Sequence, residues 1–174
     1  MDADGSDQTR LTDNYAIDHM LSWSRDGARA VFASRRDGNQ EIYVMDADGS
    51  GQTRLTDTEA DENTPSMSPD GTKVVFWSGR DGGGLYSKSS DGTGEVEQLS
   101  ESTTSQRPQG WGQNGDLLIT QAPGDIGVLR DDGSVELLLN TEFSERYPSL
   151  SPSGRWLAYR SDETGSPSVY AVSY

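Results

Sequence analysis

The sequence contains no cysteine and a single histidine among its 174 residues. Without cysteine the chain has no disulfide, no thiolate nucleophile and no sulfur ligand for zinc. One histidine cannot supply the several imidazoles that most zinc hydrolases use. These absences exclude several large enzyme classes, although they leave the redox compartment undetermined.

Lysine is scarce as well: Lys73 and Lys88 are the only two, against 29 acidic residues and a net charge of −15. So anionic a chain is repelled by nucleic acid, which is therefore not an expected partner. The preference for Arg over Lys and for Asp over Glu has two explanations, and the composition does not decide between them. One is a salt-loving organism, in which salt screens self-repulsion; the other is a GC-rich genome with a soluble acidic surface.

Long apolar runs are also missing. Hydrophobic residues make up 31% of the chain, and no run approaches the roughly 20 residues that span a bilayer. Residues 1–5 do not read as a signal peptide, so we expect no membrane insertion and no leader. Low hydrophobicity with high charge is typical of disorder, but four Trp and seven Tyr argue against it.

The sequence repeats itself at a spacing of 44 residues. Met1–Ser6 returns as Met45–Ser50, and Thr9–Asp13 returns as Thr53–Asp57. A turn-forming segment occurs four times, at residues 23–27, 67–71, 111–115 and 150–154. A period of this length is typical of solenoids, propellers and arrays.

Each unit reads as strands joined by tight turns. In the second unit Ser68–Gly71 predicts a turn and Lys73–Ser78 predicts a buried strand. Four strands in about 44 residues is the spacing of a propeller blade, and no helical periodicity appears. The sequence therefore predicts an all-β propeller of four four-stranded blades, at about residues 13–56, 57–100, 101–139, and 140–174 with 1–12.

The last unit ends at Tyr174 after its third strand, and Gln8–Thr12 would supply a fourth. We therefore expect the N-terminal strand to close the last blade and so remove an open sheet edge. The alternative is half of an eight-bladed ring that a second copy completes. The chain is thus expected to be a monomer or a homodimer.

Three segments resemble the TolB-like (WD40-like) β-propeller repeat: Pro65–Gly71, Ser34–Gly38 and Ile42–Gly49. The resemblance covers the whole chain, strongly in the first two units and weakly in the third. It implies a periplasmic or extracellular scaffold that binds ligands or proteins. Because family domains commonly have six or seven blades, a fragment of a larger protein is a further reading.

Several tempting motifs have simpler explanations. Asp46–Gly49 places glycine at the fourth position, where a calcium loop has it at the sixth, so we favour a hairpin turn. His19 beside Asp18 lacks a nucleophile elbow, which argues against acyl transfer. We expect the recurring aromatic residues to pack between blades: Trp23, Trp111, Trp156, Phe32, Phe76 and Tyr159.

Two neighbouring positions carry polar residues in all four units, at the start of each unit's first strand. The first position holds Asp18, Glu62, Gln106 and Glu145, and the second holds His19, Asn63, Arg107 and Arg146. Because the first strand of a blade is the innermost, these side chains are predicted to ring one mouth of the channel and bind a ligand there. The alternative is salt bridging between blades. Three carboxylates converging on one axis could hold Ca²⁺, and no other cofactor is expected.

The sequence favours a non-enzymatic binding module for a protein, peptide or small ligand. The alternative is a carboxylate-based, metal-assisted hydrolase or lyase that acts on glycans or peptides from within the channel. With 29 acids in the chain, a suitably spaced carboxylate pair is expected by chance, so acid abundance does not separate the two.

Overall fold

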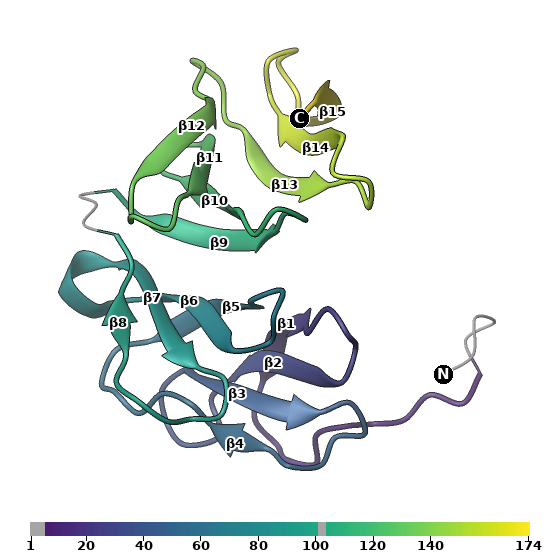
Figure 1. Cartoon of the computed structure of the whole chain (residues 1–174), viewed down its shortest axis with the longest axis vertical. Coiled ribbons are helices and arrows are strands. Elements are labelled where there is room, and N and C mark those ends of the chain that lie inside the picture. The colour runs from purple at the N-terminus through teal and green to yellow at the C-terminus, as the bar shows by residue number, and fades with distance from the viewer. Residues whose placement is uncertain (1–5, 101–103) are drawn as a thin grey trace.

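The computed structural model describes residues 6–100 and 104–174, which form four antiparallel sheets (Figure 1). Hydrogen-bonded neighbours within each sheet are consecutive in sequence, so each unit forms one blade. The four-bladed all-β propeller is confirmed. Apart from one short 3₁₀ turn at Arg80–Gly82, the described residues contain no helix.

Blades 1 to 3 have four strands each and blade 4 has three. Blade 1 contains β1 (Asp18–Trp23), β2 (Arg29–Ser34), β3 (Glu41–Asp46) and β4 (Thr53–Arg54), and blade 2 contains β5 (Glu62–Met67), β6 (Lys73–Ser78), β7 (Gly84–Ser89) and β8 (Glu97–Gln98). Blade 3 contains β9 (Gln106–Trp111), β10 (Leu117–Gln121), β11 (Asp125–Leu129) and β12 (Val135–Leu139), and blade 4 contains β13 (Arg146–Leu150), β14 (Trp156–Ser161) and β15 (Ser168–Ser173).

The predicted turns join the first two strands of each blade. In blade 2, Asp70 Oδ1 accepts hydrogen bonds from Ser68 Oγ at 2.6 Å and from the backbone N–H of Thr72 at 3.1 Å. Gly71 has a φ of 71°, a left-handed conformation that glycine adopts without strain. The turn therefore fixes the separation of β5 and β6 and the register between them.

Apolar clusters join each blade to the next. Blades 1 and 2 share a cluster that includes Val31, Ile42 and Phe76. Leu85 of blade 2 packs with Ile119 of blade 3, and the equivalent cluster between blades 3 and 4 contains Leu118, Ile126 and Leu157. β-Branched and aromatic strand residues thus bury their side chains between sheets, which stabilises the row of blades.

The expected inter-blade packing of the recurring aromatic residues holds only in part. Phe76, Trp111 and Tyr159 pack in clusters that join two blades, whereas Phe32 is buried in a cluster of blade 1 and Leu11. Trp23 and Trp156, by contrast, are 51% and 52% exposed. The sequence cannot distinguish a side chain that faces the neighbouring blade from one that faces the axis, because both positions accept a large apolar group.

The expected closure of the last blade by an N-terminal strand needs correction. Blade 4 is a three-stranded sheet, and residues 6–12 form no strand. This segment runs past blade 1 instead, where Leu11 packs on a cluster that includes Phe32, and Gln52 Nε2 donates to the Leu11 carbonyl at 2.9 Å. Contacts with blade 1 have replaced pairing with β15 (Figure 1). Residues 1–5, part of the expected turn, lie outside the described residues.

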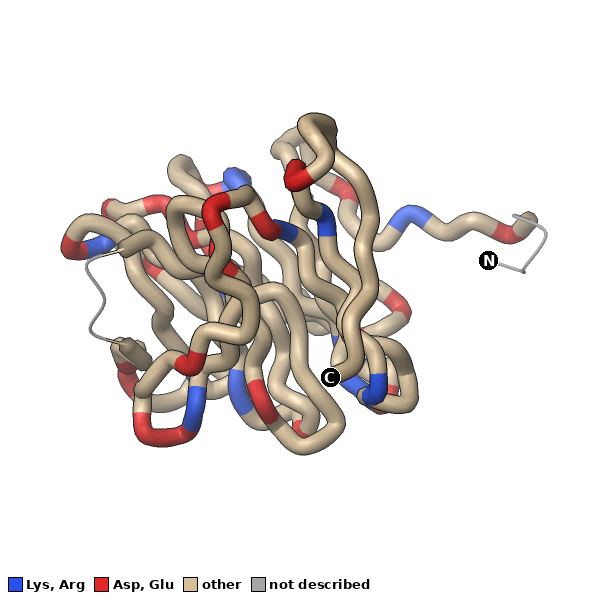
Figure 2. Tube along the Cα trace, turned by 90° about the horizontal axis from the view of Figure 1, so that it is seen from above, with Lys and Arg blue, Asp and Glu red and all other residues tan. Residues whose placement is uncertain are grey.

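Acidic residues concentrate in turns and loops, as Figure 2 shows. Within the described part of the chain, no helix has the length and apolar character needed to cross a membrane.

Candidate functional site

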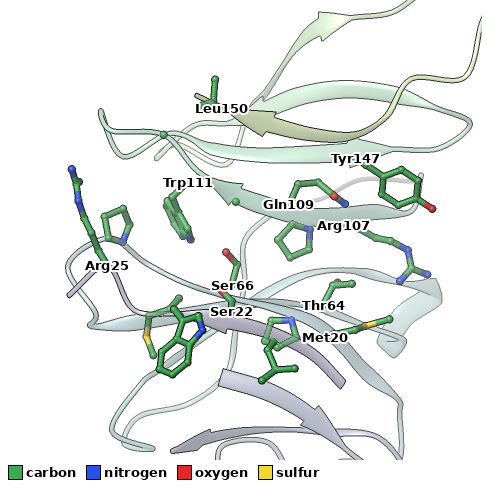
Figure 3. Close-up of a pocket in the computed structure, with 18 of the residues that line it drawn as sticks. Met20, Ser22, Arg25, Thr64, Ser66, Arg107, Gln109, Trp111, Tyr147 and Leu150 are labelled. Atoms are coloured by element: carbon green, nitrogen blue, oxygen red, sulfur yellow. The ribbon is translucent and has the colours of Figure 1, made fainter. Parts of the chain in front are cut away.

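The four innermost strands, β1, β5, β9 and β13, contribute to the wall of one pocket of about 690 Å³ (Figure 3). We call it the central pocket. Its size falls in the range of ordinary ligand sites. Residues at one repeat position, Trp23, Met67, Trp111 and Leu150, all line it. The large apolar residue that recurs in every repeat therefore lines the channel, and large apolar residues are not confined to the contacts between blades.

Polar tips interrupt this apolar wall. Ser22 and Ser66 occupy one repeat position, and Gln109 donates from Nε2 to Thr120 Oγ1 at 3.0 Å. The central pocket also contains Arg25 and Arg107. None of the described residues that line it is acidic, although the chain has 29 acids.

The inner strands of all four blades have a register irregularity, and three of them share one form of β-bulge. Between His19 and Ser22 of β1, two residues oppose one residue of β2, and β5 and β13 contain the same irregularity. The bulged residues Met20, Thr64 and Tyr147 have φ values of 56°, 47° and 56°, and all three line the central pocket. A left-handed backbone is costly for a residue with a side chain, above all for β-branched threonine, and such strain concentrates at functional sites.

Two polar atoms of the wall are buried without a hydrogen-bond partner among the described residues: Thr64 Oγ1 and Trp111 Nε1. A buried donor or acceptor left unpaired costs about 1–3 kcal/mol. A ligand or water in the central pocket that bonded to them would recover part of that cost. The strained backbone and the unpaired hydroxyl of Thr64 thus both belong to the wall of the central pocket.

Arg107 is held by an aromatic ring. Its guanidinium carbon lies 4.6 Å from the centroid of the Trp77 ring, in a cation–π contact. No carboxylate among the described residues lies within ion-pair distance of it. Arg107 also lines a smaller pocket of about 80 Å³ together with Arg146. Trp77 therefore orients the guanidinium and leaves its charge available.

The four residues of the first predicted position are equivalent in space as well as in sequence. Asp18, Glu62 and Gln106 pair with Ser34, Ser78 and Gln121 in the register of their blades, and Glu145 precedes the paired residue Arg146. Their side chains are bonded to a residue a few positions upstream at 2.5–2.9 Å, through the pairs Asn14–Asp18, Thr58–Glu62, Ser100–Gln106 and Thr141–Glu145. None of the four lines the central pocket. Each anchors the incoming loop to its own blade.

Burial and hydrogen bonding set the charge of two of these groups. Burial raises the pKa of Glu62, and the hydrogen bonds from Thr58 and Ser78 and the Arg80 charge only partly oppose that effect. At Asp18 burial also raises the pKa, but hydrogen bonds, among them one from Arg36, hold it below its ordinary value. Asp18 and Glu62 form ion pairs of 3.2 and 3.1 Å with these arginines.

The residues at the second predicted position have different surroundings in the four blades. Asn63 accepts a hydrogen bond from Gln40 Nε2, and Arg146 donates to Ser144 Oγ at 2.9 Å and to the Pro123 carbonyl at 2.8 Å. His19 lies at a half-buried site on β1. Arg107 is the one residue of the eight that lines the central pocket. Ligand binding by these residues stays a prediction.

The structure does not bring the three carboxylates of the first position together. The described residues contain no group of three or more acidic or histidine side chains placed to hold a metal ion. The bulge also explains why sequence reasoning missed Met20, Thr64 and Tyr147: an extra residue breaks the alternation on which the prediction relied. The small residues Ser22, Ser66 and Gly110, recurring every 44 residues, are the signal that could have located the axis.

Comparison with known families gives a match that agrees with the repeat and the blades. The sequence profile of the TolB beta propeller domain matches residues 20–174. The chain belongs to the TolB β-propeller domain family. A comparison of this TolB-family chain with curated proteins found no match.

Solved structures share the fold of this TolB-family chain. TolB from Acinetobacter baumannii is 24% identical with a TM-score of 0.72, and the matched region covers 94% of this chain and 42% of the Acinetobacter protein. A protein assigned as TolB from Agrobacterium tumefaciens is 20% identical with a TM-score of 0.76, and covers 94% of this chain and 60% of its own. A gluconolactonase from Xanthomonas campestris is 17% identical with a TM-score of 0.68, over 91% of this chain and 60% of its own.

This TolB-family chain therefore spans 42–60% of the length of the TolB structures that it matches. At these identities the likeness shows the fold alone, and the fold hosts both binding proteins and enzymes.

Proposed function

We propose that the chain is a non-enzymatic binding module that takes an extended peptide segment of a partner protein into the central pocket. The observation that carries the proposal is the composition of the pocket wall. Four inner strands supply aromatic and apolar side chains with a few polar groups, the combination found in ligand-binding sites. The family match supports an interaction role of this kind.

The absence of carboxylates from the described wall favours binding over the alternative of a carboxylate-based hydrolase. Glycoside hydrolysis needs two carboxyl groups about 5–10 Å apart at the substrate. Here Glu62, one of the three acids at the first predicted position, is fully buried, bonded to Thr58 and Arg80, and does not line the pocket. A location outside the cytoplasm, which the family resemblance implies, belongs to the same proposal, as does action as a monomer or a homodimer.

Panning a random library of linear heptapeptides against the immobilised chain tests this function. We expect enriched peptides that change the fluorescence of Trp23 and Trp111, since both line the central pocket. Tyr147→Ala removes an aromatic ring from the wall and should weaken binding about tenfold or more. Tyr15→Ala is the matched control, because Tyr15 is fully exposed and lies outside the pocket.

Two results would count against the proposal. Peptides that bind wild type and Tyr147→Ala equally would place binding elsewhere. Turnover of glycan or peptide substrates, with or without Ca²⁺ or Mn²⁺, that Glu62→Gln abolishes would favour the hydrolase.

A further inference from the structure

The described residues of the central pocket carry positive charge, whereas the chain as a whole is strongly negative. The protein carries a net charge of −15, yet the only charged side chains in the described wall are Arg25 and Arg107. No carboxylate of the described residues pairs with either of them. In a chain so rich in acid, a pocket whose described residues carry only positive charge attracts anionic ligands that the rest of the surface repels.

The two arginines lie at opposite ends of the pocket. Arg107 lies at the start of β9, whereas Arg25 follows the end of β1, in the turn to β2. Figure 3 shows them at the two ends, with Trp111, Ser66 and Ser22 between them. Arg107 is equivalent to His19 of β1, which lies six residues before Arg25, and one of these six is the extra residue of the bulge. At about 3.3 Å per residue the backbones are therefore at most about 16 Å apart, whereas the two side chains point away from each other and place their guanidinium groups farther apart (Figure 3).

The acidic residues at the repeat position next to Arg107 are bonded to other groups. Asp18 and Glu62, at the same level of blades 1 and 2, are already paired with Arg36 and Arg80 at 3.2 and 3.1 Å. Glu145 has no arginine partner among the described ion pairs and accepts a hydrogen bond from Thr141 Oγ1 at 2.5 Å. Within residues 6–100 and 104–174 no carboxylate pairs with Arg107, which stacks on Trp77.

We propose that the central pocket selects an extended acidic peptide, with one carboxylate bound by Arg107 and a second, about six residues away, bound by Arg25. The inference rests on the proposed function and names its ligand class. A guanidinium binds a carboxylate through two parallel charge-assisted hydrogen bonds. Between the two ends, Trp23, Trp111 and Tyr147 offer aromatic surface to the peptide, and the unpaired Thr64 hydroxyl can bond to its backbone.

Four synthetic peptides test the proposal in 0.15 M KCl. The first is acetyl-Glu-Ser-Tyr-Ser-Tyr-Ser-Glu-amide; the others replace the first, the last or both glutamates by glutamine. We expect the double-glutamate peptide to bind about tenfold or more tightly than its double-glutamine twin. Arg107→Gln should abolish the gain from one glutamate and Arg25→Gln the gain from the other. Arg155→Gln, an exposed arginine outside the pocket, is the control and should change neither.

The outcomes separate the two proposals. If the double-glutamine peptide binds as tightly as the double-glutamate peptide, and Tyr147→Ala weakens both, the binding function stands and acidic selectivity is wrong. If both glutamates still strengthen binding in Arg107→Gln and in Arg25→Gln as they do in wild type, the selectivity proposal is also overturned. If none of the four peptides binds at 1 mM, both proposals fail.

Discussion

Glu62 combines full burial with one unpaired oxygen. Its Oε1 atom accepts hydrogen bonds from Thr58, Ser78 and Arg80, whereas Oε2 has no partner among the described residues. Burial therefore outweighs its partners and raises the pKa of the carboxyl group. The equivalent position of blade 3 holds Gln106, which shows that this site of the fold accepts a neutral amide.

Glu62→Gln should change the pH dependence of stability in a defined direction. Since the folded-state pKa is raised, the contribution of Glu62 is fully present below its unfolded value near 4.5 and is lost as pH rises through the folded pKa. Glutamine does not titrate. We therefore expect the melting temperature of wild type minus that of the variant to be larger at pH 5 than at pH 7 by calorimetry. A difference that is flat or that shrinks on acidification would contradict the raised pKa.

Thr64→Gly should separate stability from binding. Threonine at a φ of 47° is strained by about 1–2 kcal/mol, and glycine removes that strain at a smaller cost in chain entropy. We expect the free energy of unfolding to stay equal or to rise by up to about 1 kcal/mol, while peptide binding in the central pocket weakens. Chemical denaturation and a binding titration measure the two effects.

Ser66→Gly, two residues along β5, is the matched control for this substitution. Ser66 is not among the residues with positive φ, so glycine there should cost about 0.5–1 kcal/mol. Equal losses of stability in both variants would show that the Thr64 backbone stores no strain.

The sequence predicted which residues of the four blades are equivalent. It did not predict which side chains face the channel axis, because that depends on the bulge. The repeat correctly predicted that Asp18, Glu62 and Gln106 are equivalent. Which side chains face the axis depends on one extra residue after His19, after Asn63 and after Arg146, and no local pattern announces it. A bulge is decided by how the inner strand fits both its neighbour and the axis, which is tertiary information.

At the scale of elements, the strands and turns followed from the sequence because their signals are local. A Ser-Pro-Asp-Gly turn and a β-branched strand need no distant partner to be recognised. Closure of blade 4 was different, since the repeat predicted that Gln8–Thr12 pairs with the last blade. The segment lies against blade 1, where Leu11 covers an apolar cluster. That choice depends on competing long-range contacts that the repeat does not encode.

Asp70→Asn tests the acidic turns at this scale. Hydrogen bonds from Ser68 and Thr72 lower the pKa of Asp70 to about 2. Its contribution to stability is therefore present above the unfolded value of 3.8 and is lost as pH falls toward about 2. We expect the variant to be less stable than wild type at pH 6, with the difference closing between about pH 4 and pH 2 in acid titrations followed by circular dichroism.

Asp131→Asn provides the comparison for Asp70→Asn, because Asp131 is exposed and lies beside a turn aspartate with its own bonds, Asp132. It should leave stability unchanged at pH 6 within about 0.5 kcal/mol. The same loss in both variants would mean that the hydrogen bonds of Asp70 add nothing beyond a negative charge.

For the whole molecule, the net charge of −15 makes self-repulsion the dominant long-range effect. Screening lengths fall from about 30 Å at 0.01 M salt to about 3 Å at 1 M. We therefore expect the melting temperature to rise by roughly 3 °C, or about 1 kcal/mol, between 0.01 M and 1 M KCl. Most of the gain should appear by about 0.3 M, because screening saturates whereas exclusion of salt from the surface does not.

Replacing exposed acids by lysine should reduce this salt gain. Glu95→Lys with Glu97→Lys, both exposed in blade 2, lowers the net negative charge by four and should raise stability at 0.01 M more than at 1 M KCl. The affinity for the double-glutamate peptide should fall as salt rises. Salt screens the attraction between the arginines of the central pocket and the two glutamates of the peptide. A melting temperature that is flat or falls with KCl would remove self-repulsion as the controlling force and with it the reading of a salt-adapted surface.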